Sequence, residues 1–474
     1  MARVLKTDLE IRQRYQKDCV MQALPEAVLE ARDWQDCLSV IQECHQKKKP
    51  VTFCGSQTSM TGSSVATEGV LISLQKKNRI LDFNKVSEEE ALVTTEPGVV
   101  LADLKKYVLN EGFLYPPDPT SYREALVGST VATNATGEET YRFGPTRIYV
   151  DSMTVIKADG TEKTLKRTKP VQVTRSKNTA GYELAGEEID HVIGSEGTLA
   201  LIKNISLRVV RNKSPHVFVL VLPFGGFQSC LRAVSQINQS QFAPRALELI
   251  GPGAVSYFER CSDCPDELKG HESFLYIKDD YGDDADLNQK IDSYFEFFKK
   301  LYADLGESQR LDQVFLATSD QQKLAIQNCR HFIPLKVNEE FFAGRSEGGG
   351  KVGSDWWVPE KHIEAMMMQT FKKAQELPFA FLVFAHIGNG HPHWNFLTQD
   401  DQQKQMAQSF VEEQCRQAVK FGGGAAGEHG IGKIKKNLLT IQHNKDTLAK
   451  MKRLKEYWDP DWIFGRGNIL DFSS

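Results

Sequence analysis

The chain has 474 residues, of which 41% are apolar and 25% are charged, and its formal net charge is −4. This composition is typical of a soluble globular protein, and the charge gives no bulk attraction for nucleic acid or for an anionic membrane. The length predicts about two to four domains.

The cellular compartment is predicted from the N-terminus, the apolar runs and the cysteines. The first 18 residues are charged throughout and lack the apolar core of a signal peptide. The longest apolar runs, residues 216–224 and 379–385, are shorter than the about 20 residues that a membrane-spanning helix takes. Nine scattered cysteines suit a reducing compartment better than a disulfide framework. We therefore expect a cytoplasmic protein with no transmembrane segment, with peripheral attachment to the inner membrane as the alternative.

The first 210 residues are predicted to mix short strands with turns and helices. Residues 49–62 are typical of a strand that enters a Gly/Ser/Thr loop, and residues 98–112 predict a helix with one apolar face. Residues 149–165 alternate apolar and polar side chains around an Ala-Asp-Gly turn, which is typical of a β-hairpin. Residues 197–210 predict further strands.

The pattern changes after residues 211–215. Strand-like runs then alternate with helices that are predicted near 226–238 and 285–304, and two more helices are predicted near 359–376 and 400–420. Such strand–helix–strand units predict an α+β layer with helices on one face of a sheet. The change also predicts a domain boundary near residue 212.

The stretch AHIGNGHPHWNF, residues 385–396, places three histidines around a Gly-Asn-Gly turn. The turn would fold two strands against each other and bring His386 and His393 to the same end of a hairpin. Two imidazoles that meet in this way suit a divalent metal such as zinc or manganese. The alternative is an ordinary turn with unligated histidines, and we expect His391 to lie exposed there.

Glu428 and His429, in the glycine-rich segment GGGAAGEHGIGK, are the next candidates for this site. A His, His, Glu ligand set leaves coordination positions open, as catalytic metals require. His429 would then be free to act as a general base near pH 7.

Residues 55–64, GSQTSMTGSS, form a loop of small residues whose backbone N–H groups suit a pyrophosphate. The loop lacks the Lys-Ser/Thr ending of a nucleoside-triphosphate loop and the GxGxxG pattern of an ordinary dinucleotide fold. Alone, it is equally compatible with a flexible turn. Similar segments at 115–121, 128–137, 142–147 and 194–199 favour a long cofactor that lies through the domain.

These motifs, in this order, resemble the vanillyl-alcohol-oxidase-type FAD family. Within it they resemble the FAD-linked 2-hydroxyacid dehydrogenases, the branch of D-lactate dehydrogenase, D-2-hydroxyglutarate dehydrogenase and the glycolate oxidase flavin subunit. The resemblance implies an α+β fold of three parts. These are a two-subdomain PCMH-type FAD-binding domain over 1–212, an α+β cap domain with an antiparallel sheet over 213–455, and a C-terminal segment over 456–474 that returns to the FAD domain.

The resemblance also implies which residues contact a non-covalently bound FAD. They match the family's pyrophosphate loop, its later flavin segments and a segment near the adenosine. They are Gly55, Ser56, Gln57, Thr58, Ser59, Gly62, Ser63, Pro117, Asp118, Gly128, Ser129, Asn134, Gly137, Gly144, Glu196, Gly197, Ile202 and Asn468.

In the cap, the resemblance implies a metal site and a substrate site. The metal ligands would be His386, His393 and Glu428, and His429 would be the base that meets the substrate. The residues expected to bind substrate are Arg330, whose guanidinium suits a carboxylate, together with Lys351, Asn395 and His429.

The chain departs from the D-2-hydroxyglutarate branch at two positions. Pro334 replaces a threonine and Gly353 replaces a lysine of that branch, so a second substrate carboxylate would lose partners. A D-lactate-like or larger monocarboxylate is therefore favoured. A larger, partly aromatic tail would contact Trp356, Trp357 or Trp394, which are equally compatible with a hydrophobic core.

The resulting hypothesis is an FAD-dependent 2-hydroxyacid dehydrogenase that oxidises a D-2-hydroxyacid to the 2-oxoacid, by metal-assisted deprotonation of the hydroxyl and hydride transfer to flavin N5. The alternatives are a non-catalytic flavin electron-transfer subunit, a flavin-free metal hydrolase and a non-redox flavoenzyme of the same fold. No motif selects the electron acceptor among a quinone, a cytochrome and an electron-transfer flavoprotein. A homodimer stays open, and no nucleic-acid partner is expected.

Overall fold

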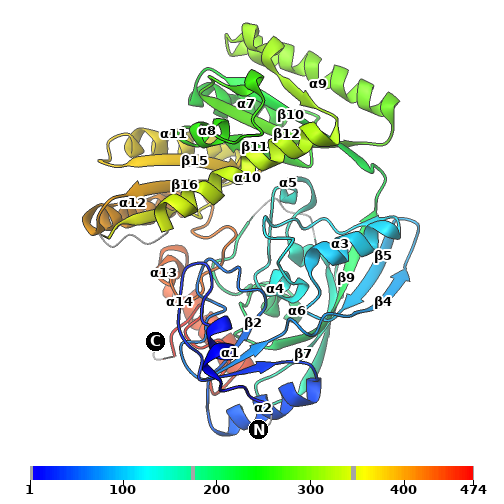
Figure 1. Ribbon diagram of the computed structural model, residues 1–474, viewed down its shortest axis with the longest axis vertical. Coiled ribbons are helices and arrows are strands. Elements are labelled where there is room, and N and C mark those ends of the chain that lie inside the picture. Colours follow the sequence, from blue (N-terminus) through cyan, green and yellow to red (C-terminus); the bar gives the residue numbers. More distant parts are fainter. Residues whose placement is uncertain (1–3, 172–176, 343–347, 473–474) are drawn as a thin grey trace.

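The computed structural model describes residues 4–171, 177–342 and 348–472. Its three β-sheets lie in two parts that are stacked along the long axis of the molecule (Figure 1). The seven-stranded sheet and its helices form one part, and the two smaller sheets form the other, where both chain ends also lie. Among the helices of the described residues, none combines the length and apolarity needed to cross a bilayer.

The three-stranded sheet is parallel and carries the first candidate loop. Its order is β1-β3-β2, and β2 runs directly into residues 55–64. Helix α2 begins after the capping side chain of Asp33 and packs one face on the sheet. The elements are α1 (Leu9–Arg14), β1 (Ala27–Glu30), α2 (Trp34–Gln46), β2 (Val51–Cys54) and β3 (Val70–Ser73).

The second sheet is antiparallel, with the order β4-β5-β9-β7-β8 and with β6 paired to β9. It contains the hairpin predicted over 149–165, which is thereby confirmed. Helices α3, α4 and α6 belong to this part, and its core is continuous with that of the cap. The elements are β4 (Ile80–Lys85), β5 (Glu90–Thr95), α3 (Leu101–Asn110), β6 (Phe113–Leu114), α4 (Val127–Ala132), α5 (Thr140–Phe143), η1 (Thr146–Tyr149), β7 (Val150–Ile156), β8 (Glu162–Lys166), α6 (Glu188–Val192) and β9 (Leu201–Arg211).

The seven-stranded sheet has the order β13-β10-β12-β11-β15-β16-β14, and all of its pairs are antiparallel. The chain enters it between the end of β9 at Arg211 and the start of β10 at His216. Its strands are β10 (His216–Phe224), β11 (Ala246–Ile250), β12 (Ser273–Tyr281), β13 (Phe315–Ala317), β14 (Gly350–Gly353), β15 (Ala380–His386) and β16 (His391–Thr398).

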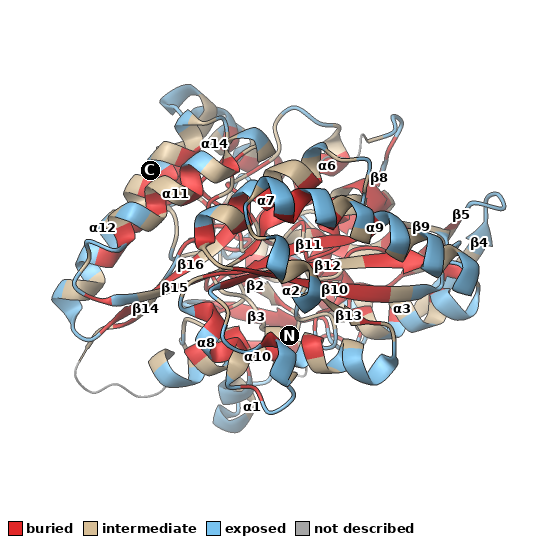
Figure 2. Ribbon diagram, turned by 90° about the horizontal axis from the view of Figure 1, so that it is seen from above, coloured by how far each residue is buried: buried red, intermediate tan, exposed pale blue. Residues whose placement is uncertain are grey.

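The two faces of this sheet pack on different helices, because side chains alternate along each strand. One face, with Val383, Trp394 and Phe396, packs on helices α7, α9, α11 and α12 in the main core. The other face, with Ile250 and Leu382, is covered in part by α8 and α10. Figure 2 shows β10, β11 and β12 largely buried and the outer sides of α9 and α12 exposed. The helices are α7 (Phe227–Gln239), α8 (Ala254–Glu259), η2 (Asp266–Leu268), α9 (Asp284–Asp304), η3 (Ser308–Gln313), α10 (Asp320–Phe342), η4 (Glu360–His362), α11 (Ile363–Ala374) and α12 (Asp401–Lys420).

After α12 the chain leaves the seven-stranded sheet and packs against the other two. Helices α13 (Asn437–Gln442) and α14 (Lys445–Trp458) lie at the red end of Figure 1, within the part that holds the smaller sheets. Phe464 forms a parallel bridge with Val51 of β2, and the buried Lys455 Nζ donates to Thr198 O at 2.6 Å. The last third of the chain thus joins both parts.

Candidate functional site

The histidine stretch folds as the predicted hairpin of β15 and β16. A short turn, η5 (Ile387–Asn389), is followed by Gly390, which has φ 67° and leaves no room for a Cβ because Val358 O would lie 1.9 Å from it. The register pairs His386 with His391, and His393 pairs with Phe384. The expectation that His391 lies exposed in the turn is wrong, because β16 already begins at this residue and its side chain is fully buried.

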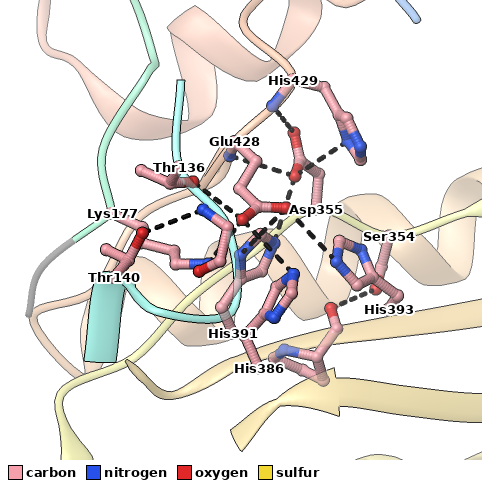
Figure 3. A network of polar contacts seen from close by, with 12 residues as sticks. Thr136, Thr140, Lys177, Ser354, Asp355, His386, His391, His393, Glu428 and His429 are labelled. Atoms are coloured by element: carbon pink, nitrogen blue, oxygen red, sulfur yellow. Dashed lines mark hydrogen bonds and ion pairs between the residues drawn. The ribbon is translucent and has the colours of Figure 1, made fainter. Parts of the chain in front are cut away.

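The predicted ligands His386, His393 and Glu428 meet at one point, because one ligand atom of each lies within 4.8 Å of the others. His386 Nε2 is 3.4 Å from Glu428 Oε1, and His393 Nε2 is 3.5 Å from Glu428 Oε2. Burial lowers the pKa of His393 to about 4, so its imidazole is neutral at pH 7, which is the state that binds a metal. Figure 3 shows these side chains pointing toward one another.

Glu428 is fixed by groups from outside the seven-stranded sheet and its helices. Thr136 Oγ1 donates to Glu428 Oε1 at 2.7 Å, and the fully buried Lys177 forms an ion pair with the same oxygen. Burial alone would raise the pKa of Glu428, but His386 and Lys177 hold it well below the ordinary value. The carboxylate is therefore ionised, with Oε1 toward His386 and Oε2 toward His393.

Two further carboxylates hold the far nitrogens of the imidazoles. Glu248 Oε1 lies 2.9 Å from His386 Nδ1, and Asp355 Oδ1 lies 3.2 Å from His391 Nε2. A metal-ligating histidine usually bonds a carboxylate through its other nitrogen. Glu248 and Asp355 supply such partners in this cluster.

Asp355 also holds the predicted base. His429 Nδ1 is 3.1 Å from Asp355 Oδ1, and Lys435 Nζ is 3.1 Å from Oδ2. The backbone N–H groups of Glu428 and His429 donate to the same carboxylate at 3.3 and 3.2 Å. The arrangement leaves Nε2 of His429 as the ring nitrogen turned away from Asp355, and the side chain is about one-third exposed, at 32%.

Arg330 lies next to this cluster, but its guanidinium is already paired. It donates to Glu138 and to Glu248, and it stacks over Tyr276 at 5.4 Å. The side chain is 14% exposed. Glu248 therefore connects Arg330 to His386. Glu138 and Glu248 neutralise the guanidinium charge that the sequence predicts to bind a substrate carboxylate.

The pairs around Arg330 continue as a buried charge network between the two parts of the molecule. Glu138 also accepts from Lys278 Nζ at 2.9 Å, and Arg142 pairs with Asp280 at 2.7 Å. Glu138 and Arg142 precede β7, whereas their partners lie on β12. The network joins the FAD-binding part to the cap by charge as well as by apolar contact.

The remaining predicted substrate residues lie on the face of the sheet that carries the histidines. Asn395 follows His393 by two residues and is opposite Gly353 in the β14–β16 register, and Lys351 lies two residues before Gly353. Burial, together with the charge of Lys435, lowers the pKa of Lys351 to about 8. Trp394 faces the opposite side and packs in the main core.

Trp356 is likewise fully buried in the main core. Trp357 is half-buried, and its backbone pairs with Gly424. Trp356 and Trp394 are therefore core residues.

The predicted cofactor residues border a cavity between β2, α4 and the turn at 195–202. More than half of the lining residues are Gly, Ala, Ser or Thr, and the cavity ends at Glu428 and His429. Ten predicted residues line it: Gly55, Gln57, Thr58, Ser59, Ser63, Gly128, Ser129, Glu196, Gly197 and Ile202.

The other predicted cofactor residues are not among those that line the cavity. Asn134, at φ 49°, accepts from the backbone of Arg147, and Ser56 Oγ donates to Glu124 O. Gly137 approaches the backbone of Asp118 so closely that a Cβ would lie 1.8 Å from its oxygen. The remaining residues of this group are Gly62, Pro117, Gly144 and Asn468, of which Asn468 donates to Ser63 O at 2.9 Å.

Glu196 lines the cavity and also anchors the returning chain. Its carboxylate accepts from the backbone N–H groups of Ile431 and Gly432, each at 2.8 Å. Burial raises the pKa of this carboxyl to about 7, although these two hydrogen bonds oppose the shift. The loop that carries Glu428 and His429 is thus held against the cavity wall.

The residues present fit both FAD and a divalent cation. Ser64 Oγ is shielded from solvent at the cavity wall and has no hydrogen-bond partner among the described residues, so a polar ligand group would satisfy it. Two imidazoles and one carboxylate at mutual contact are donors that zinc and manganese accept.

Sequence reasoning missed Glu248, Asp355, Lys177 and Thr136 as parts of the site. Glu248 is an acid inside the apolar run RALELI, and this isolated charge was the available signal. Lys177 and Thr136 carry no comparable signal, because they reach Glu428 from more than 250 residues away along the chain.

A long cavity of small residues that ends at a histidine–carboxylate cluster is typical of a cofactor-dependent enzyme. Residues 25–166 match the family described as FAD binding domain, and residues 213–469 match the family of FAD linked oxidases, C-terminal domain. The chain therefore belongs to the FAD-linked oxidases and is an FAD-linked oxidoreductase.

Three relatives show the range of activities within this similarity. The chain is 31% identical to D-lactate dehydrogenase of Anaerostipes hadrus, over 94% of this chain and 90% of that protein. It is 25% identical to glycolate oxidase subunit GlcD of Bacillus subtilis (strain 168), over 95% of this chain and 90% of that protein. It is also 25% identical to D-2-hydroxyglutarate dehydrogenase of Stutzerimonas stutzeri (strain A1501), over 98% of this chain and 95% of that protein.

Solved structures share the fold at lower identity. An alkyldihydroxyacetonephosphate synthase superposes with a TM-score of 0.67 at 15% identity and covers 98% of this chain and 82% of that chain. The 4-ethylphenol oxidase from Gulosibacter chungangensis gives a TM-score of 0.68 at 14% identity and covers 100% of this chain and 95% of that chain. The expected α+β fold of an FAD-binding part and a cap with an antiparallel sheet is confirmed.

Proposed function

We propose that this enzyme oxidises a D-2-hydroxyacid, either D-lactate-like or a larger monocarboxylate, to the 2-oxoacid. FAD would lie non-covalently in the cavity between β2 and α4, and a zinc or manganese ion would be held by His386, His393 and Glu428. The observation that supports this most is the lining of the cavity. The small-residue loop lines it together with Glu428 and His429, so the proposed metal ligand and base border the cofactor cavity.

FAD supplies a hydride acceptor when bound, and the cation supplies a Lewis acid that lowers the pKa of a bound hydroxyl. The protein's contribution is position and charge. Lys177 and Thr136 hold Glu428 Oε1, which also lies 3.4 Å from His386 Nε2, and Oε2 is left toward His393 at 3.5 Å. Glu248 and His386 fix each other at 2.9 Å.

His429 would accept the proton of the substrate hydroxyl. Asp355 holds the Nδ1 side of the ring at 3.1 Å, so Nε2 is the nitrogen left to accept a proton. Asp355 would also stabilise the imidazolium after transfer, because its own carboxylate stays ionised beside Lys435 and His429. A base placed in this way contributes typically 10²–10⁴-fold to a rate.

The substrate carboxylate would be held on the polar face of β14 and β16. Asn395 and Lys351 offer an amide and an ammonium there, and Arg330 on α10 would contribute its guanidinium by exchanging one of its carboxylate partners, Glu138 or Glu248. Gly353 offers no side chain to a second carboxylate at the position opposite Asn395. These features support a monocarboxylate over D-2-hydroxyglutarate.

The relatives support a bound small-molecule substrate and an external electron acceptor. The relative from Kluyveromyces lactis is called D-lactate dehydrogenase [cytochrome] and is 26% identical over 94% of this chain. A cytochrome, a quinone or an electron-transfer flavoprotein would re-oxidise the cofactor of the present enzyme.

The decisive experiment is anaerobic mixing of the purified holoenzyme with a panel of D- and L-2-hydroxyacids, followed by the flavin absorbance. We expect D-2-hydroxymonocarboxylates to bleach the flavin and their L-enantiomers to leave it oxidised. The variant His429→Gln should keep FAD but lose at least 10²-fold in bleaching rate. His443→Gln is the matched control, because His443 bonds Ala180 O outside the cavity.

Two results would contradict the proposal. If no 2-hydroxyacid bleaches a fully flavinated enzyme, the chain is a non-catalytic electron-transfer subunit or acts on another class of substrate. If His429→Gln bleaches as fast as the wild type, His429 is not the base.

A further inference from the structure

We infer that His391 is a fourth protein ligand of the cation, beside His386, His393 and Glu428. The inference rests on the proposed metal site and extends it, since the sequence pattern assigns only two of the three histidines to that site.

The position of His391 in the hairpin directs it into the cluster. It is the first residue of β16 and lies directly opposite His386, on the face that also carries His393. The ring centroids of His391 and His393 are 4.6 Å apart, and those of His391 and His386 are 5.9 Å apart. The three imidazoles thus share one small volume below Glu428 (Figure 3).

The two ring nitrogens of His391 are in different surroundings. Nε2 lies 3.2 Å from Asp355 Oδ1, whereas Nδ1 has no hydrogen-bond partner among the described residues and lies 4.0 Å from Glu428 Oε2. The side chain is 0% exposed, so water does not reach Nδ1 from bulk solvent. A buried polar atom without a partner costs about 1–3 kcal/mol, and a cation at Glu428 would remove that cost.

His391 repeats the arrangement of a proposed ligand. Glu248 holds Nδ1 of His386 and leaves Nε2 toward Glu428, and Asp355 holds Nε2 of His391 and leaves Nδ1 toward Glu428. A carboxylate on the far nitrogen fixes the tautomer whose lone pair faces the metal. The same geometry therefore applies to both histidines, with the two ring nitrogens exchanged.

Four protein ligands have a consequence for the ion. A substrate hydroxyl and carboxylate bind in addition only to an ion that accepts five or six donors, which zinc does by expanding its coordination and manganese does ordinarily. The fourth ligand would also hold the ion between turnovers.

The test measures metal binding rather than turnover. The metal is stripped from the FAD-loaded enzyme, and the affinity and stoichiometry for Zn²⁺ and Mn²⁺ are measured by chelator competition in the wild type, His391→Asn, His393→Asn and the control His443→Asn. We expect one ion per wild-type chain. His391→Asn should weaken binding more than 100-fold, beyond the 10–100-fold typical of losing a residue that only hydrogen-bonds a metal ligand, and it should behave like His393→Asn. The FAD content should not change.

A second measurement needs no substitution. Electron spin echo spectra of the Cu²⁺-loaded wild type count the coordinated imidazoles, and we expect three. Two imidazoles, or His391→Asn affinity within 10-fold of the wild type, would overturn the role of His391 and leave the proposed site intact. Two ions per chain would place His391 in a separate site with Asp355 and His393. A wild type that binds no ion would overturn the metal site itself.

Discussion

Glu428 and His429 are adjacent in the chain, yet their side chains join different networks. Glu428 points to Lys177 and the histidine hairpin, whereas His429 points to Asp355 at 3.1 Å (Figure 3). The glycines on both sides of this dipeptide let the backbone run between the cavity and the cap. One short loop thus places a charged ligand and a proton acceptor side by side.

The Asp355–His429 contact gives the first prediction. Asp355→Asn should lower the rate of flavin reduction by about 10²–10⁴-fold, because an amide can donate to Nδ1 and so favour the tautomer with its proton on Nε2. The rate is measured by anaerobic stopped-flow absorbance. Because Asp355 also accepts backbone hydrogen bonds, FAD content and melting temperature are recorded for the same sample. A correctly flavinated variant with wild-type rates would refute the role.

Removal of the cation gives the second prediction. Dialysis against a strong chelator should leave FAD bound and its oxidised absorbance unchanged, because the metal ligands border only one end of the cavity. Flavin reduction by substrate should fall at least 10²-fold and should return when manganese or zinc is added. Full activity after verified metal removal would show that no cation takes part.

The third prediction concerns Arg330. Arg330→Met leaves Glu138 and Glu248 without their partner in a buried site, and it should lower the free energy of unfolding by about 3–5 kcal/mol. Chemical denaturation measures this change. Arg260→Met is the matched control, because Arg260 pairs with Glu340 at 53% side-chain exposure and its loss should cost less than about 1 kcal/mol. Equal losses in the two variants would contradict the assigned burial and pairing.

Glu196 gives a prediction on pH. Its carboxyl has a pKa of about 7 in the folded protein against an ordinary value of 4.5, so the folded state holds a proton that the unfolded chain has released between these values. This contribution to stability is complete below pH 4.5 and is lost as pH rises through 7, by about 3 kcal/mol. Glu196→Gln cannot titrate, so its melting temperature minus that of the wild type should rise from pH 4.5 to 7. A constant difference would show that Glu196 does not titrate in this range.

Trp394 gives the fifth prediction. Its indole lies at 0% exposure on the apolar face of the sheet, with Phe227 and Phe381, and therefore faces away from His393. Trp394→Phe should destabilise the fold by about 1–3 kcal/mol and leave KM for the substrate unchanged. Steady-state kinetics below the melting temperature provide the measurement. A changed KM with an unchanged melting temperature would place the ring at the substrate.

The sequence predicted regular elements well where local signals were strong. The helices at 285–304 and 400–420 match α9 and α12, because Asp283 and Asp400 cap their first turns. The hairpin at 385–396 is predictable because its turn leaves no room for a side chain at position 390, so that only glycine fits there.

The contacts between distant segments could not be predicted in the same way. The burial of His391 could not be predicted, because a shift of one residue in register decides whether a side chain ends a turn or begins a buried strand. Asp355 approaches the site from the segment after β14, and Lys177 approaches it from the other part of the molecule. Nothing near them in the sequence indicates their partners. Arg330 matched a family position, but its pairing with Glu138 depends on a contact across 192 residues.

The charge network between the two parts bears on how such enzymes can be recombined. Glu138 and Arg142 meet Lys278 and Asp280 with complementary signs, and these side chains are only 9–23% exposed. A chimaera that joined this N-terminal half to a foreign cap would bury unmatched charges at the seam. Exchange of caps among relatives therefore requires that the short segment 138–142 travel together with the cap.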